Sequence, residues 1–130
     1  WVPHTIQCID EPLLEEAPTD GPPRSVVSAE GRPALTEVRR VAHLLSPEGR
    51  PVSVVEVRLH TGRQHQIRAH LSHEGHPLLG DARYGGSLQP LCPRVCLHAR
   101  DLALDVAESS CSIHVPLPTD LRKLVAALVP

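Results

Sequence analysis

Residues 55–71 constrain the fold more than any other stretch, because the spacing of apolar residues changes abruptly within them. Three aliphatic side chains first alternate as on the inward face of a β-strand: Val55, Val57 and Leu59. The alternation stops at Gly62, and apolar residues then recur at the four-residue spacing of a helix face, at Ile67 and Leu71. The pattern predicts a strand that turns directly into a short helix.

The ends of this helix are marked by residues that favour helix termini. Thr61 is of a type that caps helix N-termini, and Gly75 is of the type that ends them. These two positions predict a helix of about three turns. Between Arg58 and Leu71 the chain has three arginines, three histidines and no carboxylate. A strand-to-helix junction with this charge balance favours binding of a phosphate or a buried carboxylate.

The rest of the chain predicts further strands without a regular βαβ order. Residues 1–33 form an acidic, proline-rich segment, read as an extended loop over 12–23 with a short strand at 4–9. Alternating patterns predict a hairpin of residues 34–45 and 52–59. They also predict paired strands over 95–104 and 111–115, joined by a turn at 105–110, before a final helix that Thr119 caps. We predict an α+β class, a mainly antiparallel mixed sheet with short flanking helices, in which segment 1–33 precedes a domain portion at 34–130.

Composition limits the classes of function. The chain has 130 residues and a net charge of −2, which argues against a generally basic nucleic-acid binder. It has no Phe or Met, so aromatic stacking on bases cannot be a main means of binding a nucleic acid. All basic residues except Lys123 are arginines, which suit two-pronged contacts with phosphates and carboxylates. The four cysteines form no recognisable disulfide framework, which favours reduced thiols inside a cell. No apolar run reaches the ~20 residues that cross a membrane.

The central stretch resembles a known family. Residues 59–71 (LHTGRQHQIRAHL) and 75–85 (GHPLLGDARYG) are similar to the third motif and following loop of RluA-type RNA pseudouridine synthases. Weaker similarities occur in the same order at residues 31–36, 97–99 and 115–120. The resemblance covers about residues 30–125, and it implies part of a pseudouridine synthase catalytic domain.

The resemblance implies an isomerase that converts uridine to pseudouridine in structured RNA, as a monomer without organic cofactor or metal. In the family a catalytic Asp pairs with a basic residue of the third motif, which is Arg68 here. The family's Asp follows a string such as His-Arg-Leu, and its active-site Tyr belongs to a second motif. Neither string occurs in these residues, so we expect this chain to lack the Asp-bearing half and to be inactive alone. Asp81 and Tyr84 belong to the later loop and are not assigned those roles.

Other residues of the motifs are candidate RNA contacts. Arg63, His65 and Gln66 stand at the helix start, where they can contact RNA or support the loop. Leu97 matches a family position that lines the uracil pocket, or it is an ordinary core leucine. An arginine at position 68 can also be part of a surface salt bridge.

Two other readings of the chain stay open. One is a synthase homologue that has lost its catalytic Asp and only binds RNA. The other is a zinc-binding module, because five histidines between His60 and His76 precede Cys92 and Cys96. Their spacing does not match that of known zinc fingers.

Overall fold

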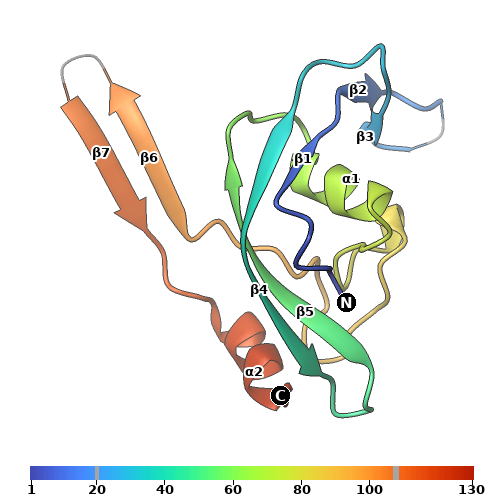
Figure 1. Cartoon of the computed structure of the whole chain (residues 1–130), viewed down its shortest axis with the longest axis vertical. Coiled ribbons are helices and arrows are strands. Elements are labelled where there is room, and N and C mark those ends of the chain that lie inside the picture. The colour runs from blue at the N-terminus through green and yellow to red at the C-terminus, as the bar shows by residue number, and fades with distance from the viewer. Residues whose placement is uncertain (20, 107–108) are drawn as a thin grey trace.

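The computed structural model describes residues 1–19, 21–106 and 109–130. Antiparallel strand pairs and short helices make up this part of the chain, which confirms the predicted α+β class. In Figure 1 one long twisted strand pair runs through the middle, a helix lies near each of its ends, and a hairpin projects to one side. In chain order the elements are β1 (Cys8–Asp10), β2 (Leu13–Glu16), β3 (Arg24–Val27), β4 (Leu35–Leu45), β5 (Pro51–Leu59), α1 (Gln66–His73), the 3-10 helix η1 (Ala82–Tyr84), β6 (Asp101–Val106), β7 (Ser109–His114) and α2 (Thr119–Ala127).

The central sheet has the order β1-β4-β5, and all of its pairs are antiparallel. Strands β4 and β5 form the hairpin that the alternating valines predicted, with Val38 opposite Val57 and Leu45 opposite Pro51. Leu59 was expected to face inward, and this was wrong, because its side chain is 44% exposed. It ends β5, which is an edge strand of the described sheet, so no neighbouring strand covers it on one side.

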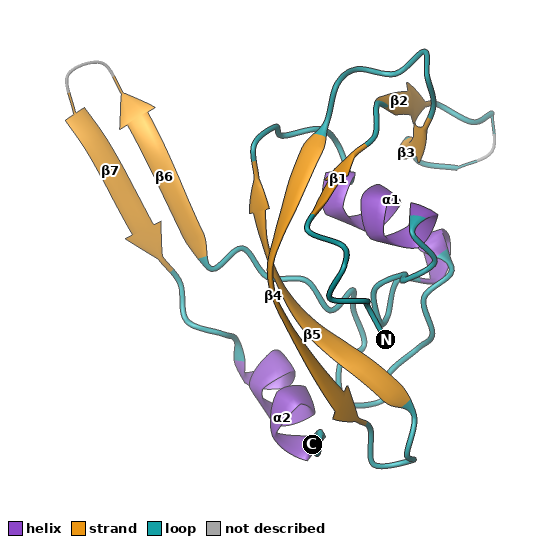
Figure 2. Ribbon diagram, in the orientation of Figure 1, coloured by secondary structure: helices purple, strands orange, loops and turns teal. Residues whose placement is uncertain are grey.

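A second hairpin, β2–β3, lies in the segment that was read as an extended loop. That reading was wrong for β2, where Leu13 pairs with Val27. Each strand has only four residues, too few to show a clear alternation. The hairpin is instead fixed by distant residues: Leu13 packs with Ala34 and Ala69. Figure 2 shows the two short strands above α1.

Helix α1 has eight residues and is shorter than predicted. Thr61 does not cap it, because the helix begins at Gln66 and His65 occupies the cap position. The predicted stop at Gly75 is confirmed: this glycine has φ 79°, and its N–H donates to the carbonyl of Ser72.

The last third of the chain forms the hairpin β6–β7 and helix α2. Strand β6 begins only at Asp101, so the predicted strand start at residue 95 was wrong. The N–H of Cys96 donates instead to the carbonyl of Leu79, which draws this segment towards the loop after α1. Part of the predicted turn at 105–110 lies outside the described residues. Helix α2 begins at Thr119, but Pro118 holds the cap position and no side chain caps it.

The apolar interior consists of small clusters rather than one large core. Leu13, Ala34 and Ala69 form one cluster beneath α1, against which Tyr84 packs. Leu121 and Leu124 of α2 form another with two cysteines described below. In the part of the chain that the structure describes, no helix is long and apolar enough to cross a membrane.

Candidate active site

The junction between β5 and α1 is held by the side chain of Gln66, which is 2% exposed. Its Oε1 accepts hydrogen bonds from the Thr61 hydroxyl (2.8 Å) and the Arg63 backbone N–H (3.0 Å). Its Nε2 donates to the Leu35 carbonyl and to the Thr36 hydroxyl, both at 3.0 Å. The amide therefore uses two acceptor and two donor positions within the chain, and it ties the start of the helix to β4.

His65 stands at the start of α1 in a left-handed conformation, with φ 52°. Among the described residues it is the only non-glycine with positive φ. Its Nδ1 lies 3.1 Å from the Tyr84 hydroxyl, and the two rings meet edge to face. Burial lowers the pKa of His65, and the nearby charges of Arg68 and Arg83 lower it further. The strained backbone thus holds a histidine with a weakened tendency to charge beside Tyr84.

Arg68 and Asp81 form a two-pronged ion pair. Nε of Arg68 lies 2.7 Å from Oδ2 of Asp81, and Nη2 lies 2.8 Å from Oδ1. The Asp81 side chain is 1% exposed and that of Arg68 is 17% exposed, so the pair is largely removed from water. Its hydrogen bonds to Asp81 raise the pKa of Arg68. The guanidinium also lies over the Tyr84 ring, 4.8 Å from its centre, in a cation–π contact.

The turn that precedes η1 places the carboxylate of Asp81. Gly80 has φ 76°, a conformation that glycine adopts without strain, and it directs the next residue towards α1. The Asp81 carbonyl accepts hydrogen bonds from the backbone N–H groups of Tyr84 and Gly86. Ser72 of α1 donates through its hydroxyl to the Tyr84 carbonyl at 2.7 Å. The helix and the turn therefore hold Arg68 and Asp81 against each other.

The ion pair was not predicted, because Asp81 was placed in the following loop without a partner. One signal was available in the sequence. The three arginines and three histidines between Arg58 and Leu71 need a nearby counter-charge, because no carboxylate lies among them. The only carboxylates in the next ten positions are Glu74 and Asp81. Glu74 is exposed at the helix end, whereas the glycine before Asp81 allows a tight turn back to the helix. Arg68 is thus in a salt bridge, but a buried one rather than the surface pair that was the alternative.

The four predicted RNA-contact residues lie in different surroundings. Arg63 donates through Nε to the Pro33 carbonyl at 3.0 Å. His65 contacts Tyr84, and the enclosed position of Gln66 favours the alternative of local support. Leu97 is half-buried in another network, described next. An RNA contact stays a prediction for each.

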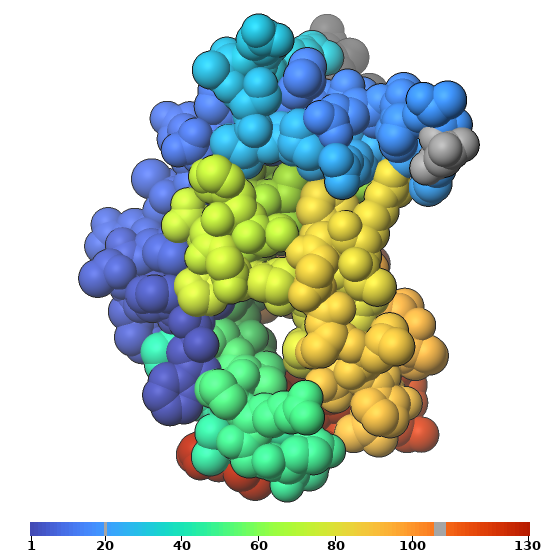
Figure 3. Space-filling view, turned by 90° about the vertical axis from the view of Figure 1, so that its right-hand side faces the viewer, coloured from blue at the N-terminus to red at the C-terminus, as the bar shows by residue number. Residues whose placement is uncertain are grey.

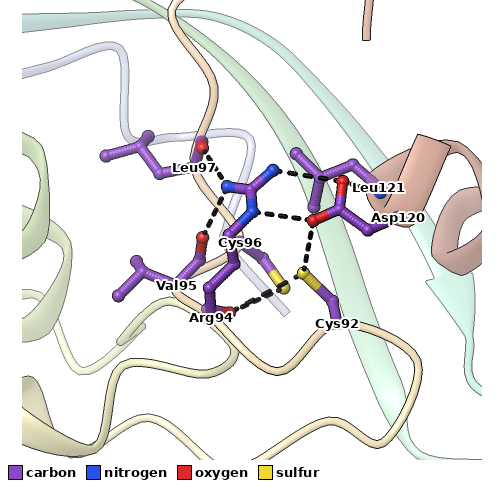
Figure 4. A network of polar contacts seen from close by, with 7 residues as sticks. All are labelled: Cys92, Arg94, Val95, Cys96, Leu97, Asp120 and Leu121. Carbon is purple, nitrogen blue, oxygen red and sulfur yellow. Dashed lines mark hydrogen bonds and ion pairs between the residues drawn. The ribbon is translucent and has the colours of Figure 1, made fainter. Parts of the chain in front are cut away.

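A second two-pronged ion pair lies apart from the motif and is drawn in Figure 4. Arg94 donates to the Asp120 carboxylate at 2.7 and 3.2 Å, and to the Leu97 carbonyl at 3.1 Å. The thiols of Cys92 and Cys96 both approach the Arg94 carbonyl. Burial and the neighbouring Cys92 raise the pKa of Cys96 to about 12. This network joins the segment before β6 to the first turn of α2.

The histidines considered for a zinc site have separate partners. His60 contacts the Glu37 carboxylate at 2.8 Å, and His70 contacts the Thr36 hydroxyl and the Glu11 carbonyl. Among the residues with described positions, no group of three His, Cys, Asp or Glu side chains lies close enough to hold a metal ion.

An open groove of about 370 Å³ lies between β3 and the turn that holds the ion pair. Tyr84 lines it together with three basic or titratable side chains: Arg24, His73 and Arg83. Figure 3 shows this side of the molecule, with the blue β2–β3 hairpin above the yellow-green α1 segment and the yellow loop after it. Arg24 forms an ion pair with Glu16 at 3.0 Å, so Arg83 is the lining arginine that has no carboxylate partner among the described residues, and it stands next to Tyr84.

Comparison with known proteins assigns the family. The model of the RNA pseudouridylate synthase family matches residues 4–73. A ribosomal large subunit pseudouridine synthase D of Haemophilus ducreyi is 35% identical over 135 aligned residues, which cover 92% of this chain and 39% of the relative. An uncharacterized RNA pseudouridine synthase, YjbO of Bacillus subtilis, is 44% identical over 55% of this chain and 25% of the relative.

A solved structure agrees with these matches. Human RNA pseudouridylate synthase domain containing 1 superposes with a TM-score of 0.73 and 28% identity, over 95% of this chain and 52% of that one. The chain therefore spans well under half the length of the synthase D relative and about half of the solved one. The matched residues include the whole strand-to-helix junction and Arg68, and the chain belongs to the RluA-type family of RNA pseudouridine synthases.

Proposed function

We propose that the protein containing this chain converts uridine to pseudouridine in structured RNA. The observation that carries the proposal is the position of Arg68. It lies in the HQIR string of the family motif, in a largely enclosed place, with its side chain held by Asp81 and Tyr84. In this proposal Arg68 is the cation that faces the catalytic carboxylate of the family.

The chemistry explains why such a cation is needed. The enzyme must break the bond between uracil and C1′, rotate the base and join C5 to C1′. The uridine must leave the base stack, because neither C1′ nor C5 is accessible within a base-paired helix. A carboxylate enclosed beside the uridine keeps its charge only if an opposite charge offsets the lost hydration. Arginine suits this role because it stays protonated and offers parallel N–H donors.

The catalytic carboxylate is proposed to come from outside residues 1–130, because the string that carries it in the family does not occur in them. The residues described here then supply its ionic partner and part of the pocket wall. On this proposal the 130 residues alone do not catalyse the reaction, and the complete protein does.

The groove beside Tyr84 is the proposed path for the RNA backbone. Arg24 is paired with Glu16 at 3.0 Å, so the positive charge along the groove comes from Arg83, and phosphates bind such charge regardless of sequence. Arg63 and His65 stand at the neighbouring start of α1. All proposed contacts come from one chain, so we expect the enzyme to act as a monomer. We also expect it to act inside the cell, where structured RNA is found.

The test uses the complete protein and RNA labelled with tritium at C5 of uridine. Pseudouridine formation replaces the hydrogen on C5 by the bond to C1′, so each turnover releases tritium. We expect release by the wild type, and a loss of several orders of magnitude in kcat for Arg68→Ala. RNA binding, measured by filter retention, should weaken far less, because one contact among many is lost.

Two results would contradict the proposal. Normal tritium release by Arg68→Ala would show that Arg68 is not the cation that the catalytic carboxylate needs. Tight RNA binding by the wild type without any release would instead identify a homologue that only binds RNA. The double variant Arg68→Ala/Asp81→Asn guards against misfolding, since it leaves no buried carboxylate without a cation.

A further inference from the structure

We propose that Asp81 is a positioning residue, which fixes Arg68 by one edge of its guanidinium so that the other edge faces the catalytic carboxylate. This inference rests on the proposed function and adds a residue to it. It starts from the two contacts of the ion pair, Nε to Oδ2 and Nη2 to Oδ1.

A guanidinium carries five N–H groups in one plane. Asp81 takes the N–H of Nε and one N–H of Nη2, which together form the side edge of the group. The remaining N–H of Nη2 and one N–H of Nη1 point outward in parallel and form the end edge. Within the described part of the chain no hydrogen bond reaches Nη1 of Arg68. The end edge is thus free to bind a second carboxylate in the same two-pronged manner.

The orientation of this edge is fixed from several directions. The side edge is held by a carboxylate that is itself 1% exposed and cannot turn to water. The face of the guanidinium lies on the Tyr84 ring. The Tyr84 hydroxyl is anchored to the backbone N–H of Ser25 at 2.9 Å. Arg68 therefore has little freedom to swing, and the geometry of the catalytic pair is prepared before RNA binds.

The charge balance also argues against a purely structural pair. For stability alone, two apolar side chains in this place would serve as well as an enclosed ion pair. An Arg–Asp pair that leaves one arginine edge open keeps that edge available to a second anion. The proposed catalytic carboxylate has the matching charge.

The test measures kcat and KM of the complete protein with tritium-labelled RNA for four variants. Asp81→Asn keeps the shape of the side chain and removes its charge and one acceptor oxygen. Loss of alignment should lower kcat on the order of 10²-fold, with KM for RNA changed little. Arg68→Ala should lower kcat further. The double variant should match Arg68→Ala within about twofold, because Asp81 acts only through Arg68.

Asp101→Asn is the control. It removes the charge from an ion pair on the projecting β6–β7 hairpin, where the partners of Asp101 are Arg100 and His114, neither of which is a candidate RNA contact. Its kcat should equal that of the wild type within about twofold. If Arg68→Ala does not fold, the double variant replaces it as the reference for complete loss, and the comparison of Asp81→Asn with the wild type still decides.

The outcomes separate the two proposals. If the wild type releases no tritium, both the proposed function and this inference are wrong. A wild-type kcat for Asp81→Asn, together with an inactive Arg68→Ala, overturns the positioning role alone. The role is also overturned if Asp81→Asn lowers kcat by the same factor with and without Arg68, because its effect then does not pass through that residue.

Discussion

The hydroxyl of Thr36 on β4 lies 2.9 Å from Nδ1 of His70 on α1, and both residues are fully buried. The same hydroxyl accepts a hydrogen bond from Nε2 of Gln66, so its own hydrogen is available to His70. His70 in turn donates through Nε2 to the Glu11 carbonyl, which can only accept. These hydrogen bonds are therefore all donated in the same direction, from Gln66 through Thr36 and His70 to Glu11. They link the helix to β4 and to the segment between β1 and β2.

Replacing Thr36 by Val should destabilise the protein by about 2 kcal/mol, because the change leaves two buried polar groups without a partner. These are an N–H of Gln66 and Nδ1 of His70. Urea unfolding followed by circular dichroism measures the effect. Thr5→Val, at an exposed position, is the control and should change little. If Thr36→Val lowered the free energy of unfolding by no more than Thr5→Val does, the chain of hydrogen bonds would add nothing to stability.

The two halves of the Arg68–Asp81 pair should not be equivalent in stability. Arg68→Ala leaves a carboxylate at 1% exposure without a counter-charge, which should cost about 3 kcal/mol. Asp81→Asn leaves the partly exposed arginine, which can turn towards water, and should cost about 1 kcal/mol. Thermal unfolding of both variants tests the order. The opposite order would mean that Asp81 finds another partner.

Acid should destabilise the protein partly through His65. Its pKa is lowered in the folded state, mainly by burial, from an ordinary value near 6.5. As the pH falls below about 6.5 the unfolded chain takes up the proton first, so stability is lost until the folded pKa is reached. Above that window the residue has no effect. His65→Asn, which tolerates positive φ, should lose less stability than the wild type between pH 7.5 and 5.5, as measured by urea unfolding. Equal losses would contradict the lowered pKa.

Two adjacent glycines should respond differently to alanine. Gly85 has φ 87° and open space around it, so Gly85→Ala should cost only the backbone strain of about 1–2 kcal/mol. At Gly86 an added Cβ would collide with the Leu78 carbonyl oxygen. This clash lies in the turn that places Asp81, so Gly86→Ala should cost more stability and also lower kcat. Equal effects in thermal unfolding and in tritium release would refute the distinction.

The four thiols should differ in reactivity. Cys8 and Cys111 are exposed, Cys92 is buried, and the pKa of Cys96 is raised to about 12. Since the thiolate is the reactive form, iodoacetamide at pH 8 should modify Cys8 and Cys111 first. Mass spectrometry of peptides from the folded protein gives the four rates. Labelling in urea is the control, in which the differences should disappear. Fast labelling of Cys96 in the folded state would contradict its enclosure.

The parts of the fold that the sequence predicts are those with a strong local signal. Val55, Val57 and Leu59 alternate along the second strand, and the turn after Ser46 contains Pro and Gly, so the β4–β5 hairpin was predicted correctly. The β2–β3 hairpin has no such signal. Its place depends on Ser25 meeting Tyr84, 59 residues later in the chain. A local pattern cannot contain that information.

The same distinction applies to the candidate site. The HQIR string predicted Arg68 as the ionic partner of a catalytic carboxylate. In the structure the Arg68 side chain is largely enclosed, with 17% exposure. Thr61 was expected to cap the helix because of its residue type, but its hydroxyl donates to Gln66 instead. Asp81 was not recognised, because the turn at Gly80 that directs it to Arg68 becomes visible only in three dimensions.

The separation of Arg68 and Asp81 along the chain has a consequence for biosynthesis. The two partners are only 13 positions apart in the sequence, and loops of about this length close on the order of 100 ns. The bridge between Leu45 and Val129, by contrast, must wait until almost all of these residues have emerged from the ribosome. The oriented guanidinium can therefore be assembled on the growing polypeptide well before β4 receives its last neighbour.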